Sequence, residues 1–489
     1  MIASPTILLA LLASQVSATS SIRGGVQEHR QLQEDDAIVR DFVPLSCNNV
    51  MSPCTSFAAT FGPAPIYMDR LVIPCGTCYT MDHAAPGLVL LGGLEIRGKL
   101  VFPEDYKLRV VTPFVVVQGE LEINAERKPI DGELNVEFLL TGDDTYQSFE
   151  PIGENANACK GEETCTIGKK AFVVAGGSVN MRGISSNTPT WTRLHDVVGD
   201  DTIVLPNSVQ SKWMPGAEIL ITSHTFQYDG HQVRTIESVK TSRRAGYVEL
   251  QLNEKIIRPT TMLDSRDFAV EVALLSRNIQ FRGLSDPNPN HGGHFQVFHT
   301  PAVPQTVQGI DFVNFGQQGK LGYYPIHFHF CGDSPNSSVF KNTIRESNQR
   351  CVVVHGTNEL RVEYNVAFDT KGHCFITEDG MEIRNEFKYN LGALTGIPDE
   401  IIPDNGFNGE ESDGEPATFW ITNPNNKFVG NVAAGSLGSG FWYELRLRGE
   451  QAHLYPDLDP MFVKLGSFHG NIAHSNEGKR VSRTQTRPE

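Results

Sequence analysis

The residues most able to do chemistry lie in positions 324–333, where two histidines stand two residues apart. Side chains alternate along a β-strand, so His327 and His329 face one side while Phe328 faces the other. Asp333 follows four residues after His329. Such a face predicts either acid–base catalysis or metal binding, or else a hydrogen-bonded polar stack in the interior.

Two further histidines follow at intervals that suit a repeating structure. His355 and His373 lie 28 and 46 residues after His327. One coil of a β-solenoid takes about 20–25 residues, so these side chains are predicted to stack on neighbouring coils. Together they would form a column of imidazoles along one face.

Two adjacent carboxylates, Glu378 and Asp379, end the segment after His373. Hydrolysis of a glycosidic bond uses a pair of carboxylates. Neighbours on a strand face opposite sides, so the pair is Glu378 with Asp379 only if the strand ends between them. Otherwise Asp333 or Asp369 is the second carboxylate, and a solvated turn is the alternative to a site.

Other side chains suit the binding of a sugar polymer. Guanidinium groups bind carboxylates through two hydrogen bonds, and aromatic rings stack on the apolar faces of sugars. Arg350 could instead pair with Glu346, the tryptophans could be core residues, and the asparagines could form turns. The predicted substrate-binding residues are Arg350, Trp420, Asn423, Asn425 and Trp442.

The elements that would position these residues are short strands. Residues 88–98, 114–123 and 171–181 each contain an apolar run, a glycine turn and an alternating run. This pattern predicts an all-β domain with a repeating plan.

A second periodicity appears after residue 270, where an asparagine precedes small or apolar residues. The recurring asparagines lie 23, 25, 41 and 40 residues apart, at Asn342, Asn365, Asn390, Asn431 and Asn471. The shorter spacings predict single coils of a parallel β-helix, with inward asparagines bonded to the next coil. The longer ones predict either two short coils or one coil with an insertion, and residues 398–415 read as an insertion loop.

Composition and processing signals indicate an extracellular protein. The net charge of −16 argues against a broad nucleic-acid or anionic-membrane surface. Residues 1–18 resemble a signal peptide, and no later run is long and apolar enough to span a membrane. The nine cysteines fit an oxidising compartment, with local disulfides predicted within 47/54, 75/78 and 159/165 and at least one cysteine left over. Half a zinc site is the alternative for 75/78. Asn336 begins a glycosylation sequon.

Residues 271–476 resemble a known family. Matching segments in the same order include Tyr-Pro-Ile-His-Phe-His at 324–329, Arg-Cys-Val-Val-Val-His-Gly at 350–356 and Gly-His-Cys-Phe-Ile-Thr-Glu-Asp-Gly at 372–380. They are similar to the β-helix of the family of the cell migration-inducing and hyaluronan-binding protein and its transmembrane relative. The glycine-punctuated region resembles that family's eight-glycine (G8) domain. The sequence shows no counterpart of the family's globular insert between the two regions.

The resemblance implies an all-β fold in which a glycine-punctuated domain precedes a right-handed parallel β-helix. The predicted organisation is a signal peptide (1–18), a flexible leader (19–45), the eight-glycine-type domain (46–190), a connecting β segment (191–269) and the β-helix (270–489). The resemblance also implies binding or cleavage of hyaluronan, with calcium as a possible cofactor.

Three functions follow from these observations. The first is a secreted enzyme that binds and depolymerises hyaluronan or a similar uronate-containing glycan, with catalytic residues drawn from His327, His329, Asp333, His355, His373, Glu378 and Asp379. The second is a non-catalytic extracellular polysaccharide-binding or matrix protein. The third is a cell-surface scaffold whose loops bind another protein.

Overall fold

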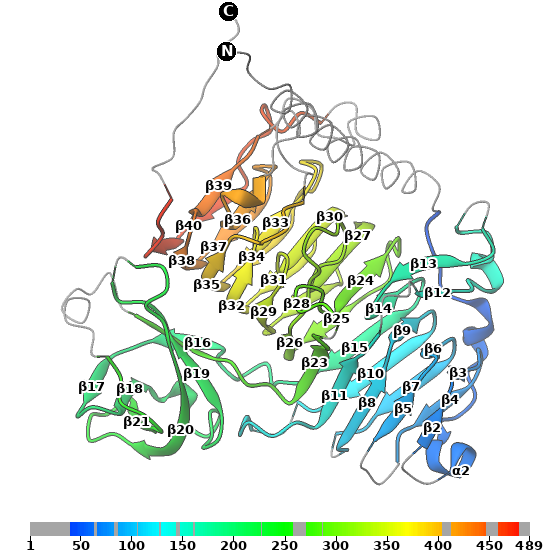
Figure 1. The fold of residues 1–489 in the computed structure, drawn as a ribbon, viewed down its shortest axis with the longest axis horizontal. Helices are drawn as coiled ribbons and strands as arrows, with labels where there is room; N and C mark the ends of the chain where they lie inside the picture. Colours follow the sequence, from blue (N-terminus) through cyan, green and yellow to red (C-terminus); the bar gives the residue numbers. More distant parts are fainter. Residues whose placement is uncertain are drawn as a thin grey trace, which may run out of the picture.

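Three long parallel β-sheets form the body of the molecule, and successive coils of the chain contribute one strand to each sheet (Figure 1). The computed structural model describes residues 40–478 except 63–65, 83–86, 105, 127–128, 143–146, 160–161, 226, 258–269, 286, 403–411 and 446–457. The predicted signal peptide, most of the predicted leader and half of the predicted loop at 398–415 lie outside the described residues. The predicted all-β fold with a parallel β-helix is confirmed.

The strands of each sheet follow one another in the order of the coils. The first sheet contains β1 (Thr55–Ser56), β4 (Cys78–Thr80), β7 (Lys99–Phe102), β10 (Glu120–Asn124), β15 (Ser178–Arg182), β25 (Thr306–Gln308), β28 (Ser338–Phe340), β31 (Arg361–Glu363), β34 (Glu386–Lys388), β37 (Lys427–Val429) and β40 (Ser467–His469). The second contains β2 (Ile66–Met68), β5 (Leu88–Leu90), β8 (Leu108–Thr112), β11 (Val136–Leu140), β23 (Ile279–Gly283), β26 (Ile310–Val313), β29 (Thr343–Ser347), β32 (Val366–Lys371), β35 (Leu391–Gly396), β38 (Val432–Ser436) and β41 (Ile472–His474).

The third sheet carries the histidines. It contains β3 (Leu71–Ile73), β6 (Leu94–Ile96), β9 (Phe114–Val117), β14 (Ala171–Val174), β24 (His294–Phe298), β27 (Ile326–Asp333), β30 (Val352–Asn358), β33 (Phe375–Thr377), β36 (Ala417–Ile421) and β39 (Ser439–Tyr443). Because all three sheets run through both halves of the chain, the glycine-punctuated region forms the first coils of the same helix.

Glycines make the corners between the third and first sheets tight. At Gly98, Gly119 and Gly177, an added methyl group would overlap carbonyl oxygens of the preceding coil. The glycine turns seen in the sequence therefore do not make hairpins. They let the backbones of stacked coils approach more closely than a side chain permits.

The recurring asparagines form a ladder through the interior. Asn390 Oδ1 accepts hydrogen bonds from Asn365 N and Nδ2, at 3.0 and 2.9 Å, and Asn431 accepts the same pair from Asn390. Each side chain also donates to a carbonyl of the coil before it, as Asn390 does to Val362 at 2.8 Å. The predicted inward asparagines are confirmed. The direct Asn390–Asn431 step means that the 41-residue spacing is one coil with an insertion.

The sheet faces turned toward the axis are apolar. Phe375, Phe419 and Phe441 occupy the same position on successive coils and stack with ring centroids 4.9 and 4.7 Å apart. They belong to a core cluster that runs from Phe57 to Ala433. Stacking the same residue type in register buries each coil against the next, which a single coil cannot do alone.

A compact unit lies beside the helix and interrupts the coils (Figure 1). Its seven strands pair antiparallel: β16 (Trp191–Arg193), β22 (Glu271–Leu274), β19 (Glu218–Ile221), β20 (Gln232–Thr241), β21 (Tyr247–Leu252), β18 (Thr202–Pro206) and β17 (Asp196–Val198). It has its own core around Trp213. The described part of residues 191–269, which was predicted to be only a connecting β segment, therefore lies in a globular unit. The sequence had indicated no globular insert between the two regions.

The remaining described elements are short. The hairpin β12 (Gln147–Phe149) and β13 (Cys165–Gly168) pairs antiparallel. The helical turns are η1 (Ser46–Val50), α2 (Phe57–Phe61), η2 (Gly153–Asn155), η3 (Asn207–Val209) and η4 (Ser412–Gly414). Among the described helices, none is long and apolar enough to cross a membrane.

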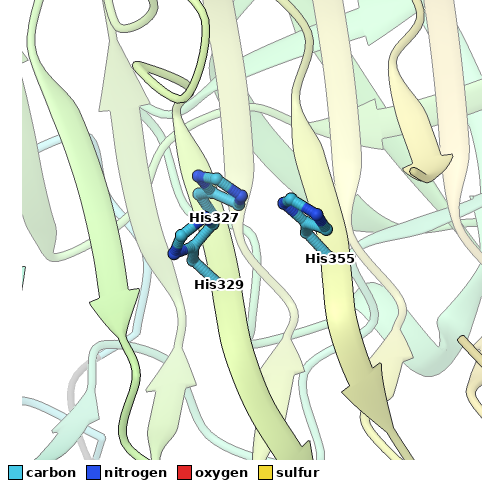
Figure 2. Close-up of side chains that lie close together, drawn as sticks. All are labelled: His327, His329 and His355. Carbon is cyan, nitrogen blue, oxygen red and sulfur yellow. The ribbon is translucent and has the colours of Figure 1, made fainter. Parts of the chain in front are cut away.

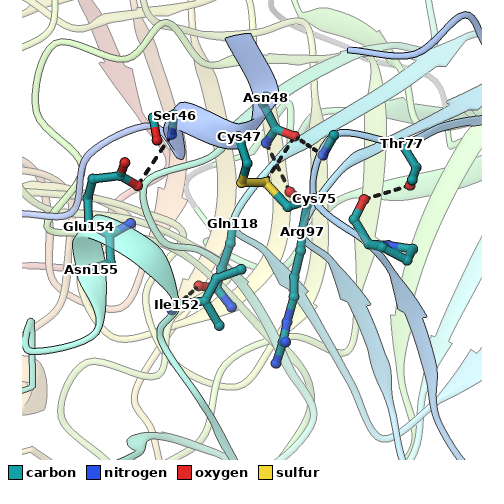
Figure 3. Close-up of a disulfide and its surroundings, with 12 residues drawn as sticks. Ser46, Cys47, Asn48, Cys75, Thr77, Arg97, Gln118, Ile152, Glu154 and Asn155 are labelled. Carbon is teal, nitrogen blue, oxygen red and sulfur yellow. Dashed lines mark hydrogen bonds between the residues drawn. A yellow bond between two sulfur atoms is a disulfide. The ribbon is translucent and has the colours of Figure 1, made fainter. Parts of the chain in front are cut away.

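Disulfides fasten the N-terminal segment to the first coils. Cys47 bonds Cys75 and Cys54 bonds Cys78, so the predicted local pairs 47/54 and 75/78 are wrong. The physical reason is stacking, because β1 lies directly on β4 and brings cysteines of different coils together. Figure 3 shows Asn48 beside the first bridge, where it accepts from Gly76 N at 2.8 Å. The local pair Cys159–Cys165 is confirmed. Cys351–Cys374 also forms, and Cys331 is buried and free.

Candidate functional site

Three of the predicted histidines meet on the outward face of the third sheet. His327 and His329 lie on β27 and His355 lies on β30, directly opposite His329 in the register (Figure 2). Phe328 points inward to the core, as the alternation predicted. One ring nitrogen from each histidine lies within 4.8 Å of the other two.

The histidine cluster is buried, although it lies outside the central core. His327 and His329 are 1% and 6% exposed, and the side chain of His355 is 12% exposed. On one flank the same face is covered by Phe42 and the β12–β13 hairpin, and on the other by Ile402. Burial lowers the pKa values of His327 and His329 well below the ordinary value, so both rings are neutral at pH 7.

Glu378 and Asp379 follow β33 and both reach His355. Asp379 Oδ2 lies 2.8 Å from His355 Nε2, and Glu378 Oε2 lies 3.2 Å from His355 Nδ1. Strand β33 ends at Thr377, so the alternation rule no longer separates the two carboxylates. They therefore both belong to the site, as the sequence allowed if the strand ended there.

A buried ion pair with Arg350 holds the carboxylate of Glu378 in place. Arg350 Nη1 donates to Glu378 Oε1 at 2.7 Å, and Tyr324 OH donates to the same oxygen at 3.2 Å. Arg350 is fully buried and also approaches Asp413 Oδ2 at 3.4 Å. Arg350 was predicted to bind substrate, but its guanidinium is instead committed to these internal carboxylates.

A second polar group forms around His373, next to the first. Its Nδ1 accepts from Ala417 N at 3.0 Å, and its Nε2 lies 3.1 Å from Ser412 Oγ and 3.5 Å from Asp413 Oδ1. Burial lowers the pKa of His373 to about 4. Burial alone would raise the pKa of Asp413, but Arg350 and His373 outweigh it, so the net shift is downward. His373 therefore supports the site through Asp413 and Arg350, without joining the three histidines.

Glu382 closes the turn after Asp379. Its carboxylate accepts hydrogen bonds from Gly356 N, Asp379 N and Gly380 N, at 3.0, 3.1 and 2.9 Å. Burial and the nearby Asp379 raise its pKa to about 7. This residue holds the backbone that presents Asp379 to His355.

The predicted residue Asp333 does not join the cluster. Strand β27 breaks its alternation after His329, where Phe330 and Gly332 have φ of +50° and +55° and the register with β30 shifts. Asp333 lies beyond this bulge, where its 65% exposed side chain pairs with Arg384 at 3.1 Å. Asn336 lies exposed in the following turn, where the sequon predicted a surface position.

The predicted aromatic platform is largely internal. Trp420 is 5% exposed and stacks on His373 with centroids 3.9 Å apart, and Trp442 stacks on Trp420 at 6.2 Å. Asn423 is buried and bonds Gly380 O, and its Oδ1 accepts from Asn425 N. These asparagines build a turn, which was the alternative that the sequence left open.

Sequence reasoning missed Tyr324, Asp413 and Glu382. Tyr324 lies three residues before His327, inside the segment already singled out. Asp413 comes from the insertion between β35 and β36 and is buried. In the sequence it is one of several acidic residues of this insertion, and nothing in the sequence marks it as the buried one. No spacing rule predicts which residue of an insertion returns to the sheet.

Comparison with known proteins agrees with this architecture. Residues 59–195 match the model of the G8 domain, and residues 290–480 match that of the CEMIP β-helix. The chain therefore contains a G8 domain and a CEMIP β-helix domain. All three histidines, Arg350, Glu378 and Asp379 lie in the β-helix match.

Curated relatives share most of the chain. A G8 domain-containing protein of Dictyostelium discoideum is 32% identical over 85% of this chain and 27% of its own length. Cell surface hyaluronidase CEMIP2 of Homo sapiens is 29% identical over 68% of this chain and 26% of its own. Fibrocystin-L of Homo sapiens is 27% identical over 83% of this chain and 10% of its own length. The chain thus spans about a quarter or less of the length of these relatives.

Calcium, which the resemblance implied, does not fit the histidine cluster. Calcium takes six to eight oxygen ligands. Here three imidazole nitrogens lie within 4.8 Å of one another, and Glu378 and Asp379 are the two carboxylates that contact His355. The cluster therefore offers mainly nitrogen ligands, which suit transition-metal ions better than calcium.

Proposed function

We propose that this protein is secreted and that it binds and depolymerises hyaluronan or a similar uronate-containing polysaccharide. The observation that carries the proposal is the group formed by His355, Glu378 and Asp379, held by Arg350 on the outward face of the third sheet. Two relatives are named cell surface hyaluronidases, one from Homo sapiens and one from Danio rerio. Four disulfides support an oxidising, extracellular location.

The arrangement supplies what glycan cleavage needs. Two carboxylates lie on either side of one imidazole, so a proton can be held or released at His355 or at Asp379. Arg350 donates to one oxygen of Glu378 and so orients this carboxylate, although both side chains are buried. His355 is the most exposed of the three histidines and is the side chain that a sugar would reach first.

The test is a change in polymer length. Purified protein would be incubated with hyaluronan, with other uronate polymers and with neutral dextran, and product size would be measured by size-exclusion chromatography with light scattering. We expect shortening of a uronate polymer but not of dextran. Ultraviolet absorbance of unsaturated uronates separates elimination from hydrolysis. Folded protein that shortens none of the uronate polymers would refute the proposal.

Paired variants assign the chemistry to the cluster. Asp379→Asn removes the carboxylate that His355 contacts, and we expect the rate to fall about 10²-fold or more. Asp333→Asn makes the same chemical change at an exposed residue outside the cluster, and we expect no change in rate. Equal rates for the two variants would contradict a site at His355 and Asp379.

Burial favours one alternative, a protein that binds the polysaccharide without cleaving it. His327, His329 and Glu378 are each less than 10% exposed, which limits access to the cluster. Under this alternative, hyaluronan is retained by the immobilised protein, turnover is absent, and Asp379→Asn leaves retention unchanged.

A further inference from the structure

The hydrogen bonds of the histidine cluster leave a set of electron-pair donors facing one another. His327 Nδ1 lies 3.0 Å from Gly322 O, a carbonyl that can only accept. The proton of the neutral ring is therefore on Nδ1, and Nε2 carries a lone pair. That buried Nε2 has no hydrogen-bond partner among the described residues, and it lies 3.8 Å from Glu378 Oε2.

His355 is oriented in the same way by a different partner. Asp379 Oδ2 accepts from its Nε2 at 2.8 Å, and in the neutral tautomer with the proton on Nε2 the lone pair is on Nδ1. That atom lies 3.2 Å from Glu378 Oε2. In this tautomer two nitrogen lone pairs and a carboxylate oxygen converge, an arrangement that a cation lying among them would stabilise.

The third histidine completes the set. His329 stands opposite His355 on the neighbouring strand, and the ring centroids of these two residues are 4.9 Å apart. One of its ring nitrogens is the third of the three nitrogens that lie within 4.8 Å of one another. Figure 2 shows the three rings together. Histidines that bind metals commonly give their other N–H to a carbonyl or a carboxylate, as His327 gives to Gly322 and His355 to Asp379.

We propose that His327, His329 and His355, together with Glu378, form a binding site for a divalent transition-metal ion of the zinc type. Three imidazoles and one carboxylate match the four-ligand preference of Zn²⁺ and oppose the oxygen preference of Ca²⁺. Arg350 and Tyr324 hold the other oxygen of Glu378, which leaves Oε2 directed at the histidines. The proposal goes beyond glycan cleavage, because the ion can bind whether or not a glycan is cleaved.

Metal binding to the full chain tests the proposal directly. After dialysis against EDTA and then metal-free buffer, Zn²⁺ would be titrated by isothermal calorimetry, and Co²⁺ by its visible absorption spectrum. We expect one equivalent of each ion, a cobalt spectrum typical of nitrogen ligands, and no competition from a hundredfold excess of Ca²⁺. A melting temperature that rises with Zn²⁺ gives a readout that needs no variant.

Variants locate the ion. His327→Ala and His355→Ala should each weaken Zn²⁺ binding at least a hundredfold, and Asp379→Asn should weaken it about 10–100-fold by releasing the orientation of His355. His469→Ala removes an exposed histidine of β40 and should bind like the unaltered chain. Folding of each variant is checked by its melting temperature in EDTA.

Three results would overturn the assignment. They are the absence of Zn²⁺ and Co²⁺ binding by folded protein, equal binding by His355→Ala and His469→Ala, and displacement of Zn²⁺ by Ca²⁺. None of these depends on a polysaccharide, so the metal site and the proposed cleavage can fail separately.

Discussion

At the scale of single residues, Arg350 is the point on which the two polar groups of the site depend. Its guanidinium is fully buried and contacts both Glu378 and Asp413. Removing one partner of a buried ion pair costs more than the pair itself contributes, because the remaining charge stays buried and unpaired. Arg350 therefore acts as a positioning residue.

This role predicts a large loss of stability in Arg350→Met. We expect the free energy of unfolding at pH 7 to fall by about 3–5 kcal/mol, because two buried carboxylates lose their cation. Urea unfolding followed by circular dichroism measures the loss. Arg384→Met is the control, since Arg384 pairs with exposed Asp333 and should cost about 1 kcal/mol or less. Similar losses for the two variants would contradict the role assigned to Arg350.

The site residues that could be predicted from the sequence were those on regular strands, where side chains alternate between the two faces. This alternation placed His327 and His329 on one face and was correct as far as the strand was regular. It failed at Asp333, because positive φ at Phe330 and Gly332 and a shift in the register with β30 interrupt the alternation after His329. Phe330 gives no sequence signal for that conformation, since a bulky residue seldom adopts it.

At the scale of elements, the asparagine ladder fixes how the coils stack. The side chain of Asn390 makes four hydrogen bonds that join three consecutive coils, and all of its partners are buried. The sequence predicted this ladder because one residue type recurs at one position of each coil. It could not predict the globular unit at 191–274, whose strands pair with one another and have no such repeat.

The ladder predicts that Asn390→Ala destabilises the β-helix strongly. The variant leaves the backbone N–H of Asn365 and the carbonyl of Val362 buried without these partners. Each such group costs about 1–3 kcal/mol, so we expect a loss of about 2–6 kcal/mol in urea unfolding. Asn187→Ala, at an exposed position, should change the free energy by less than about 0.5 kcal/mol. A loss below 1 kcal/mol in Asn390→Ala would show that the ladder is not structural.

At the scale of the whole molecule, burial of neutral histidines couples folding to pH. Burial lowers the pKa of His231 and of His373 to about 4, and that of His294 to about 3. Each unfolded histidine takes up a proton near pH 6.5, whereas the folded one does not. Their stabilising contribution is therefore complete above pH 6.5 and is lost as the pH falls toward 4.

Glu382 acts in the opposite direction. Burial and Asp379 raise its pKa to about 7, so its charged form is penalised in the folded state. That penalty is full above pH 7 and is relieved as the pH falls toward 4.5. Between pH 7 and pH 5 the three histidines lose about 2 kcal/mol each, while Glu382 regains about 2 kcal/mol. The histidines outweigh the single carboxyl group.

Acidification should therefore destabilise the protein by at least about 4 kcal/mol between pH 7 and pH 5, because the buried His327 and His329 add to the loss. Urea unfolding at both pH values measures this, with EDTA present throughout so that metal release does not contribute. Glu382→Gln removes the opposing group, and the loss in that variant should be larger by about 2 kcal/mol. A stability that stays level or rises on acidification would mean that His231, His294 and His373 titrate normally in the folded chain. The folded protein would then be open to water at these three positions, contrary to their burial in the structure.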